Sequence, residues 1–284
     1  MKDIDIIEAC SDLGINVEGA ALGPKVLEKY VSTNNIYKIE LENIKKEKDK
    51  ENKKKNLKYI NEFNEKLYDR VLETINQGRF PLTIGGDHSI AIASSLASIK
   101  KHKNLGIIWL DSHGDFNTFK TTITGNIHGL PLAAITGFEK QELTKFHEGN
   151  FYPYKNTVIV GARDVDELEM VNIKEAGITV FTTEDIKKYG AKNIVEKAIS
   201  ITSDGTEGIH ISYDIDLIDP EVAPGVSVPA KNGINMNEVE EINKILIKNK
   251  ELIKSMDLVE FNPLRDIDNK TEEIAKYILQ CLFS

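Results

Sequence analysis

Eight short runs rich in β-branched residues recur along this chain, and longer segments with apolar residues at helical spacing separate most of them. Short apolar runs of this kind predict strands, and the longer amphipathic segments predict helices. Regular alternation of the two predicts an α/β fold in which helices cover both faces of a parallel sheet. The predicted strands are Ile4–Ile7, Ile36–Ile39, Phe80–Ile84, Gly106–Leu110, Thr157–Val160, Ile178–Phe181, Ile209–Tyr213 and Met256–Val259, and the predicted helices include Leu57–Asn76, Ser89–Lys101, Val165–Ala176, Ala191–Thr202 and Asn237–Lys248.

The length of the chain suits one large domain. Its 284 residues, 40% of them hydrophobic, are enough for a single α/β core and short for two. No internal repeat and no linker rich in proline, glycine or serine divides the sequence. We therefore predict a single domain over residues 1–284.

Charge and hydropathy narrow the classes of partner. A formal net charge of −9 and a pI near 5.3 disfavour nucleic acid and fit a small cationic substrate better. Acidic residues interrupt the apolar N-terminus, unlike a signal peptide, and no apolar run reaches membrane-spanning length. The two isolated cysteines, Cys10 and Cys281, suit a reducing compartment. These features predict a soluble cytoplasmic protein without a membrane or nucleic-acid partner.

Polar clusters begin where three of the predicted strands end. Phe80–Ile84 leads into Gly-Gly-Asp-His-Ser, Gly106–Leu110 into Asp-Ser-His-Gly-Asp, and Ile209–Tyr213 into Asp-Ile-Asp. In an open parallel sheet, ligands bind beyond the carboxyl ends of the strands, so we expect these clusters to converge on one site. The converging side chains would be His88, Asp111, His113, Asp115, Asp214 and Asp216.

These six side chains have the chemistry of a metal site. Residues two apart at a strand end project to the same side, so Asp111, His113 and Asp115 are expected to face one point. Four carboxylates in one place repel each other unless cations neutralise them, and two divalent ions would do so. Oxygen-rich ligation with two imidazoles and no thiolate favours Mn²⁺, with Co²⁺, Fe²⁺ and Ni²⁺ as alternatives.

Each motif by itself also has an ordinary explanation. Asp-x-His-x-Asp occurs in plain loops, paired aspartates are common in turns, and Gly-Gly-Asp-His suits a turn that caps a helix. Three such motifs at three strand ends favour the metal site. The remaining histidines, His102, His147 and His210, are interpreted as structural or surface residues.

With these motifs the sequence resembles the ureohydrolase superfamily, and within it the arginases. The resemblance covers nearly the whole chain and implies a three-layer α/β/α fold with an eight-stranded parallel sheet, in agreement with the eight predicted strands. The motifs that carry it are Gly-Gly-Asp-His-Ser (85–89), Asp-Ser-His-Gly-Asp-Phe-Asn (111–117), Gly-Asn-Ile-His-Gly-Leu-Pro (125–131), Gly-Ala-Arg-Asp-Val-Asp (161–166), Ser-Tyr-Asp-Ile-Asp-Leu-Ile-Asp-Pro (212–220) and Glu-Phe-Asn-Pro (260–263).

The resemblance also implies which residues hold the metal ions. Asp111 and Asp214 would bridge two Mn²⁺ ions. The full ligand sets would be His88, Asp111, Asp115 and Asp214 for one ion, and Asp111, His113, Asp214 and Asp216 for the other.

Further residues match the substrate site of arginases. Asn117, Thr122 and Thr124 match the loop that contacts the amino-acid carboxylate. Asp166 matches the carboxylate that receives the α-amino group, with Glu169 beside it. The resemblance therefore implies an amino-acid substrate.

The implied reaction is hydrolysis of L-arginine to L-ornithine and urea by a hydroxide that bridges the two Mn²⁺ ions. Glu260 would pair with the guanidinium, and His128 would carry protons because imidazole titrates near physiological pH. Asp115 would pass the hydroxide proton to the departing amine. On local sequence alone, Glu260 is equally well a turn carboxylate, and His128 a hydrogen-bonded loop histidine.

Other functions compete with this interpretation. The nearest is another ureohydrolase reaction, on agmatine or on a different guanidino or formimino compound, although the form Gly-Asn-Ile-His-Gly-Leu-Pro favours arginine. A two-metal phosphoesterase is disfavoured because no later Gly-Asn-His-Asp/Glu cluster follows. A non-catalytic metal-binding protein is disfavoured because all six ligands are present. The resemblance further implies a homotrimer or a homohexamer.

Three residues depart from the arginase pattern. Ser112 replaces the usual alanine, with little expected effect, and Thr124 replaces the usual serine while keeping the hydroxyl. Val228 stands where arginases commonly have threonine near the guanidinium, which leaves the rate and the choice of substrate open. Outside the motifs, we interpret the charged segment Lys45–Lys55 as a solvated helix face or a mobile excursion.

Overall fold

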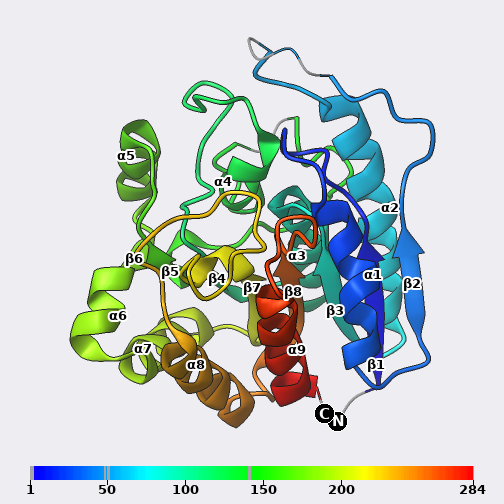
Figure 1. Cartoon of the computed structure of the whole chain (residues 1–284). Helices are drawn as coiled ribbons and strands as arrows, with labels where there is room; N and C mark the ends of the chain where they lie inside the picture. Colours follow the sequence, from blue (N-terminus) through cyan, green and yellow to red (C-terminus); the bar gives the residue numbers. More distant parts are fainter. Residues whose placement is uncertain (1–2, 48, 50–51, 140–141, 284) are drawn as a thin grey trace.

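The centre of the molecule is an eight-stranded sheet in which every neighbouring pair of strands is parallel (Figure 1). The computed structural model describes residues 3–47, 49, 52–139 and 142–283. The order of strands across the sheet is β2-β1-β3-β8-β7-β4-β5-β6. The strands are β1 (Ile4–Ala9), β2 (Ile36–Ile39), β3 (Phe80–Gly85), β4 (Gly106–Leu110), β5 (Thr157–Ala162), β6 (Thr179–Thr182), β7 (Ile209–Asp214) and β8 (Ile253–Val259).

Helices pack against both faces of this sheet (Figure 1). One apolar core joins the sheet to α1, α6, α7, α8 and α9, and a second core joins it to α2, α3, α4 and α5. Three layers result, as the resemblance implies. The helices are α1 (Gly23–Leu27), α2 (Leu57–Asn76), α3 (Ala91–His102), α4 (Pro131–Ile135), α5 (Glu167–Ala176), α6 (Thr183–Tyr189), α7 (Ala191–Ser203), α8 (Met236–Lys248) and α9 (Lys270–Phe283).

The predicted fold class is confirmed, and the predicted elements differ from the observed ones mainly at their ends. Each predicted strand is present, and α2 begins and ends at the predicted residues. Helix α5 begins at Glu167, two residues later than predicted, because Asp166 has extended backbone and precedes the first helical turn. Within the described residues, no helix is long and apolar enough to cross a bilayer.

The order of the strands determines where the polar residues that follow them meet. Strands β3, β8, β7 and β4 are consecutive in the middle of the sheet, and the chain crosses from one half of the sheet to the other between β3 and β4. Strands β4 and β5 are buried along their whole length, as their nearly continuous apolar sequences predict, and β7, whose sequence alternates apolar and polar residues, is buried as well. The polar residues that follow these four strands therefore meet at one edge of the sheet, where the direction of winding changes.

The charged segment Lys45–Lys55 differs from its interpretation as a helix face or a mobile excursion. Among its described residues, 45–47, 49 and 52–55, none is helical, and residues 48, 50 and 51 lie outside the described part of the chain. Lys45 and Lys54 are exposed, but Lys55 is buried at 3% exposure. A lysine is rarely buried without partners, and those of Lys55 are described below.

Candidate metal centre

His88 lies three residues after the end of β3 and is held in one orientation. Its Nε2 atom is 2.8 Å from Ser212 Oγ, and its ring stacks on the Trp109 indole with ring centroids 4.0 Å apart and an interplanar angle of 5°. Both partners lie on neighbouring central strands, so the ring cannot turn without disturbing the sheet. This arrangement leaves Nδ1 as the nitrogen available to a further ligand.

Three carboxylates surround that nitrogen. The distance from His88 Nδ1 to the Oδ2 atom is 3.1 Å for each of Asp111, Asp115 and Asp214. One ring proton cannot serve three carboxylates, and within the described residues His88 Nδ1 is buried without a hydrogen bond of acceptable geometry. Donor atoms about 2.1 Å from one cation in an octahedral arrangement lie about 3.0 Å apart. The spacing of the four atoms therefore fits the first coordination shell of a divalent cation.

A second group of donors adjoins the first. His113 Nδ1 lies 3.3 Å from Asp111 Oδ1 and 3.1 Å from Asp216 Oδ2. Asp111 thus faces His88 with one oxygen and His113 with the other, which is the position of a bridging ligand. Five of the six predicted metal residues form two groups that share Asp111, and the sixth, Asp115, joins the first group at 3.1 Å from His88 Nδ1.

Burial makes the negative charges of this cluster energetically unfavourable unless cations neutralise them. Asp111, Asp115, Asp214 and Asp216 are each at most 5% exposed. Burial, followed by the charges of Asp216 and Asp111, raises the pKa of Asp214 well above its usual value. Burial lowers the pKa of His88, but the three carboxylates next to its ring outweigh that effect and raise the pKa well above its usual value. The cluster therefore has a strong demand for positive charge, which cations meet.

Neighbouring groups orient the ligands. Trp109 Nε1 donates to Asp111 Oδ2 at 2.9 Å, and the amide of Asp216 donates to Asp214 Oδ1 at 2.7 Å. Ser112 Oγ lies 2.7 Å from Asp216 Oδ1 and 3.0 Å from His113 Nδ1. Ser112 therefore touches two candidate ligands, although the sequence led us to expect little from it.

Sequence reasoning missed Trp109 and Ser212 as members of the site. Each lies two residues before a candidate ligand on the same strand, Trp109 before Asp111 and Ser212 before Asp214. Residues two apart on a strand share a face, so the alternation of side chains carries the signal that identifies them.

Glu260 and His128 lie together next to His88. Glu260 follows β8 with a φ of 64°, a left-handed conformation that few residues other than glycine adopt. Its Oε1 atom accepts a hydrogen bond from the His88 amide at 2.9 Å and lies 3.1 Å from His128 Nδ1. Its Oε2 atom is buried and has no hydrogen-bond partner within the described residues. One oxygen of Glu260 is thus fixed, and the other is available to a ligand.

The residues expected to hold the amino-acid end form two groups. Asn117 Nδ2 donates to Asp166 Oδ2 at 3.2 Å, so these two side chains meet. Glu169 is buried beneath them, where its carboxylate accepts from the amides of Phe116 at 2.7 Å and Asp166 at 3.1 Å. Burial raises the pKa of Glu169 to about 8. Glu169 supports the backbone around Asn117 and Asp166 instead of facing a ligand directly.

Thr122 and Thr124 lie on the 122–126 loop. Thr122 Oγ1 accepts from the Gly125 amide at 3.0 Å, and Thr124 Oγ1 accepts from the Asn126 amide at 3.1 Å. Thr122 is buried, whereas Thr124 is exposed. Gly125 has a φ of 69°, which permits the sharp turn that follows Thr124.

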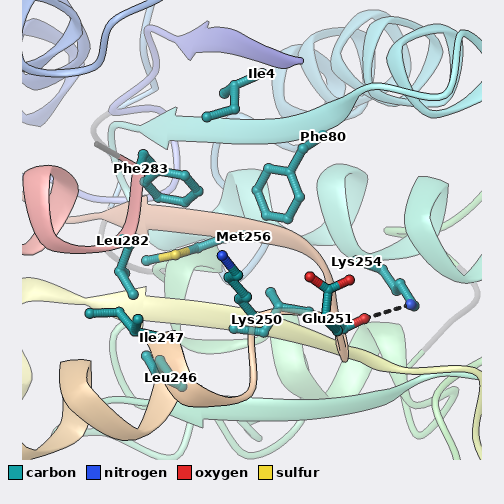
Figure 2. Close-up of a pocket in the computed structure, with 11 residues that line it drawn as sticks. Ile4, Phe80, Leu246, Ile247, Lys250, Glu251, Lys254, Met256, Leu282 and Phe283 are labelled. Carbon is teal, nitrogen blue, oxygen red and sulfur yellow. Dashed lines mark hydrogen bonds between the residues drawn. The ribbon is translucent and has the colours of Figure 1, made fainter. Parts of the chain in front are cut away.

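An apolar cavity at the opposite end of the sheet is separate from this site (Figure 2). It has a volume of about 190 Å³, and Ile4, Phe80 and Ile253, the first residues of β1, β3 and β8, line it together with Met256 and Phe283. The candidate metal ligands follow the other ends of the strands. The cavity therefore takes no part in the chemistry of the cluster.

A three-layer α/β/α fold with a cluster of buried carboxylates and imidazoles at the carboxyl ends of its parallel strands defines a class of proteins that bind paired divalent cations. Comparison with known proteins then identifies the family. The sequence matches the profile of the Arginase family over residues 2–284. The chain belongs to the Arginase family, a family of hydrolases, as its motifs predict.

Two curated relatives and two solved structures illustrate the similarity. The arginase of Bacillus caldovelox is 35% identical over 297 residues, covering 100% of this chain and 98% of the relative, and that of Brevibacillus brevis is 37% identical, covering 99% and 98%. The native structure of the B. caldovelox enzyme superposes with a TM-score of 0.91, covering 100% of this chain and 99% of that one. The structure of the Entamoeba histolytica arginase in complex with L-ornithine also superposes with a TM-score of 0.91. It is 29% identical, and the match covers 100% of this chain and 98% of that one.

Proposed function

We propose that this protein hydrolyses the guanidinium group of L-arginine to L-ornithine and urea, using two Mn²⁺ ions held by the cluster at the carboxyl ends of β3, β4 and β7. The observation that carries the proposal is the buried Nδ1 atom of His88, which faces three carboxylates at 3.1 Å. The full-length similarity to arginases supports it. So does the E. histolytica arginase, whose structure holds L-ornithine, the amino acid that this reaction releases.

The proposed ligands of one ion are His88, Asp111, Asp115 and Asp214, and those of the other are Asp111, His113, Asp214 and Asp216. When bound, two divalent ions supply a water whose pKa is low enough to give a nucleophile near neutral pH. Oxygen-rich ligation without a thiolate suits Mn²⁺. Trp109, Ser112 and Ser212 hold the ligands in place through the contacts given above.

Glu260 is proposed to bind and orient the guanidinium. Its free Oε2 atom is buried and its Oε1 atom is fixed by the His88 amide, so the carboxylate lies beside the cluster in one orientation. A carboxylate accepts two parallel N–H bonds from a guanidinium, which fixes the plane of the group. The guanidinium carbon is then presented to the nucleophile that the metal centre supplies.

Asp115 and His128 are proposed to move the protons. The oxygen of water forms a bond to the guanidinium carbon, and the bond from that carbon to the side-chain nitrogen breaks. Asp115 takes the proton of the nucleophile and gives it to the departing nitrogen, which leaves as the amine of ornithine. His128, 3.1 Å from Glu260 Oε1, exchanges protons between the site and water.

The amino-acid end of the substrate is assigned to the loops that follow β4 and β5. Asp166 receives the α-amino group, and Asn117, which donates to Asp166, contacts the carboxylate together with Thr122 and Thr124. Glu169 acts through the backbone of Phe116 and Asp166. An amino acid with a guanidinium at its far end matches this pair of polar regions.

The second candidate substrate is agmatine, which lacks the carboxylate. Val228, which is half-buried, stands where the arginase resemblance places a threonine hydroxyl near the guanidinium, and this departure leaves the choice of substrate open. The curated arginases are 35–38% identical over at least 99% of this chain, whereas the solved structure of a hypothetical agmatinase from Burkholderia thailandensis is 20% identical, which shows a shared fold alone. L-Arginine is therefore the favoured substrate.

Urea release from L-arginine and from agmatine, measured side by side with protein preincubated with Mn²⁺, tests the proposal. We expect metal-dependent urea from L-arginine and little from agmatine. Urea from agmatine alone, or from neither, would contradict the assignment of the substrate.

We also propose that the chain acts as one domain over residues 1–284, in the cytoplasm, as a homotrimer or homohexamer. The family match along residues 2–284 supports the first point, and the acidic composition without a membrane-spanning helix in the described residues is compatible with the second. Light-scattering mass distinguishes a trimer from a hexamer.

A further inference from the structure

Two lysines of the charged segment Lys45–Lys55 donate hydrogen bonds to the 122–126 loop. Lys53 Nζ donates to the carbonyl oxygens of Thr122 and Ile123, the latter at 2.8 Å. Lys55 Nζ donates to the Thr124 carbonyl at 2.8 Å and to Asn126 Oδ1 at 3.1 Å. Three consecutive carbonyls of the loop therefore point at two ammonium groups.

The lysines are themselves fixed to the fold. Asn56, between Lys55 and the first residue of α2, donates through Nδ2 to the Leu13 carbonyl at 3.0 Å and accepts from the Glu47 amide at 2.7 Å. Lys55 is 3% exposed, and burial of an ammonium group is unfavourable unless oxygen atoms surround it. The segment therefore holds the loop from a rigid base at the start of α2.

The loop packs tightly on this base. A Cβ atom added to Gly125 would lie 2.8 Å from the Asn52 carbonyl oxygen and 3.0 Å from Lys53 Cα. The same glycine has a φ of 69°, so both its conformation and its space exclude a side chain. The position of Thr124 thus depends on the segment beneath it.

The amide side of the loop is open. The carbonyl and N–H of a trans peptide unit point in opposite directions, so the Ile123 and Thr124 amides face away from the lysines. In the described part of the chain, neither amide has a hydrogen-bond acceptor. The two positive charges, together with the peptide dipoles that they align, favour an anion on the amide side.

We propose that Lys53 and Lys55 are positioning residues for the α-carboxylate of the substrate, and that they favour an amino acid over its decarboxylated analogue. They act by fixing the carbonyl side of the 122–126 loop and by adding positive charge next to it. This inference rests on the proposed function, in which Thr122 and Thr124 contact that carboxylate. It assigns to this part of Lys45–Lys55 a role that its composition does not reveal.

The test compares three substitutions of adjacent lysines in the full chain loaded with Mn²⁺. Lys53→Met and Lys55→Met remove the two ammonium groups that hold the loop. Lys54→Met is the matched control, because Lys54 is exposed and pairs with Glu142, and its ammonium group lies 5.2 Å from the centre of the Phe119 ring, outside the 122–126 loop. The measurements are KM and kcat for L-arginine, the Kd of L-ornithine and of putrescine by calorimetry, and bound manganese per chain.

We expect Lys53→Met and Lys55→Met each to raise the KM for L-arginine and the Kd of L-ornithine about tenfold, the size of effect expected for a lost charge-assisted hydrogen bond. We expect kcat to stay within about twofold, and putrescine binding and manganese content to be unchanged, since these do not depend on the carboxylate. Lys54→Met should match the wild type in every measurement.

An unchanged KM in Lys53→Met, or an equal rise in Lys54→Met, would overturn the inference. A joint loss of kcat and manganese would also overturn it, since that result indicates general damage to the site. If Lys55→Met does not fold, Lys53→Met decides, because the Lys53 side chain is only half-buried. A wild type that neither cleaves L-arginine nor binds L-ornithine would remove the proposed function and this inference together, whereas an active wild type with an unaffected Lys53→Met would remove the inference alone.

Discussion

Two buried clusters of histidine and aspartate lie in the central sheet, and they differ in how many carboxylates each imidazole must satisfy. His210, on β7, has Nδ1 2.6 Å from Ser255 Oγ and Nε2 3.0 Å from Asp257 Oδ2. His88 has one nitrogen on Ser212 and the other facing three carboxylates. Both histidines are at most 1% exposed.

The difference shows why burial alone does not identify a metal site. At His210 one imidazole meets one carboxylate, both ring nitrogens have partners, and Ser94 donates to the same Asp257 oxygen at 2.7 Å. Asp257 Oδ1 is buried without a partner among the described residues, but the ring has only one carboxylate to serve, so this group needs no added cation. At His88 the carboxylates outnumber the protons that the ring provides, so the cluster is completed only by added positive charge. We therefore interpret His210 as structural and His88 as a metal ligand.

Among the substitutions at the two clusters, Asp214→Asn is expected to have the largest effect on metal binding and turnover. This change removes a charge that both proposed ions share, so we expect fewer bound ions and a loss of turnover of at least about 1000-fold. Metal analysis and urea release on the same samples measure both effects. Full metal occupancy with normal turnover would show that Asp214 is not a bridging ligand.

Glu260→Gln is expected to lower kcat/KM for L-arginine by about 100- to 1000-fold. Its amide cannot accept a bidentate pair of N–H bonds, and misplacement of the reacting group is costly. The number of bound ions should not change. An unaffected rate would remove Glu260 from the substrate site.

His128→Asn is expected to lower kcat by about 100-fold, the low end of general acid–base contributions, while two ions remain bound. Its ring is not among the donors that surround the ions, so metal analysis is the control. Loss of metal in this variant would contradict its proposed role in proton transfer.

Ser112→Ala tests whether the groups around the ligands matter. Its hydroxyl lies 2.7 Å from Asp216 Oδ1, and removal of such a partner weakens metal binding by about tenfold or more. Titration with Mn²⁺ should show one of the two ions bound more weakly. An unchanged affinity for Mn²⁺ in the variant would show that Ser112 has only the small effect expected from its sequence.

His210→Gln completes the series with the smallest effect on the chemistry. The free energy of unfolding should fall by about 2 kcal/mol, because the buried Asp257 loses a partner. Activity should stay within about twofold, with two ions bound. Loss of manganese would mean that the two clusters are coupled and that the comparison between them is wrong.

Much of the fold was predictable because the strands repeat a local pattern. The β-branched runs mark each strand, and nearly continuous apolar sequences indicate that β4 and β5 lie inside the sheet. The ends were less predictable: β1 continues through Glu8 to Ala9, although a buried glutamate interrupts the apolar run. Burial raises the pKa of Glu8 to about 7. Hydrophobic periodicity does not indicate that a polar residue occupies this buried strand position.

The candidate ligands were predictable for a related reason. Asp111 and Asp214 directly follow predicted strands, and His88 lies four residues after one. Parallel strands bring their carboxyl ends together, and these residues with them. The contacts of Lys55 were not predictable, because its partners are a backbone carbonyl and a side chain about 70 residues later in the sequence. The sequence of a charged run does not reveal whether solvent or a loop carbonyl accepts the hydrogen bonds of each ammonium group.

The most direct test of the central claim is the number of ions that the wild-type chain binds at equilibrium, with urea release from L-arginine followed in the same titration. We predict two Mn²⁺ ions per chain, with full activity reached only when both are bound. Saturation at one ion or none, or urea release that does not depend on added metal, would contradict a two-metal centre built around His88 and Asp111.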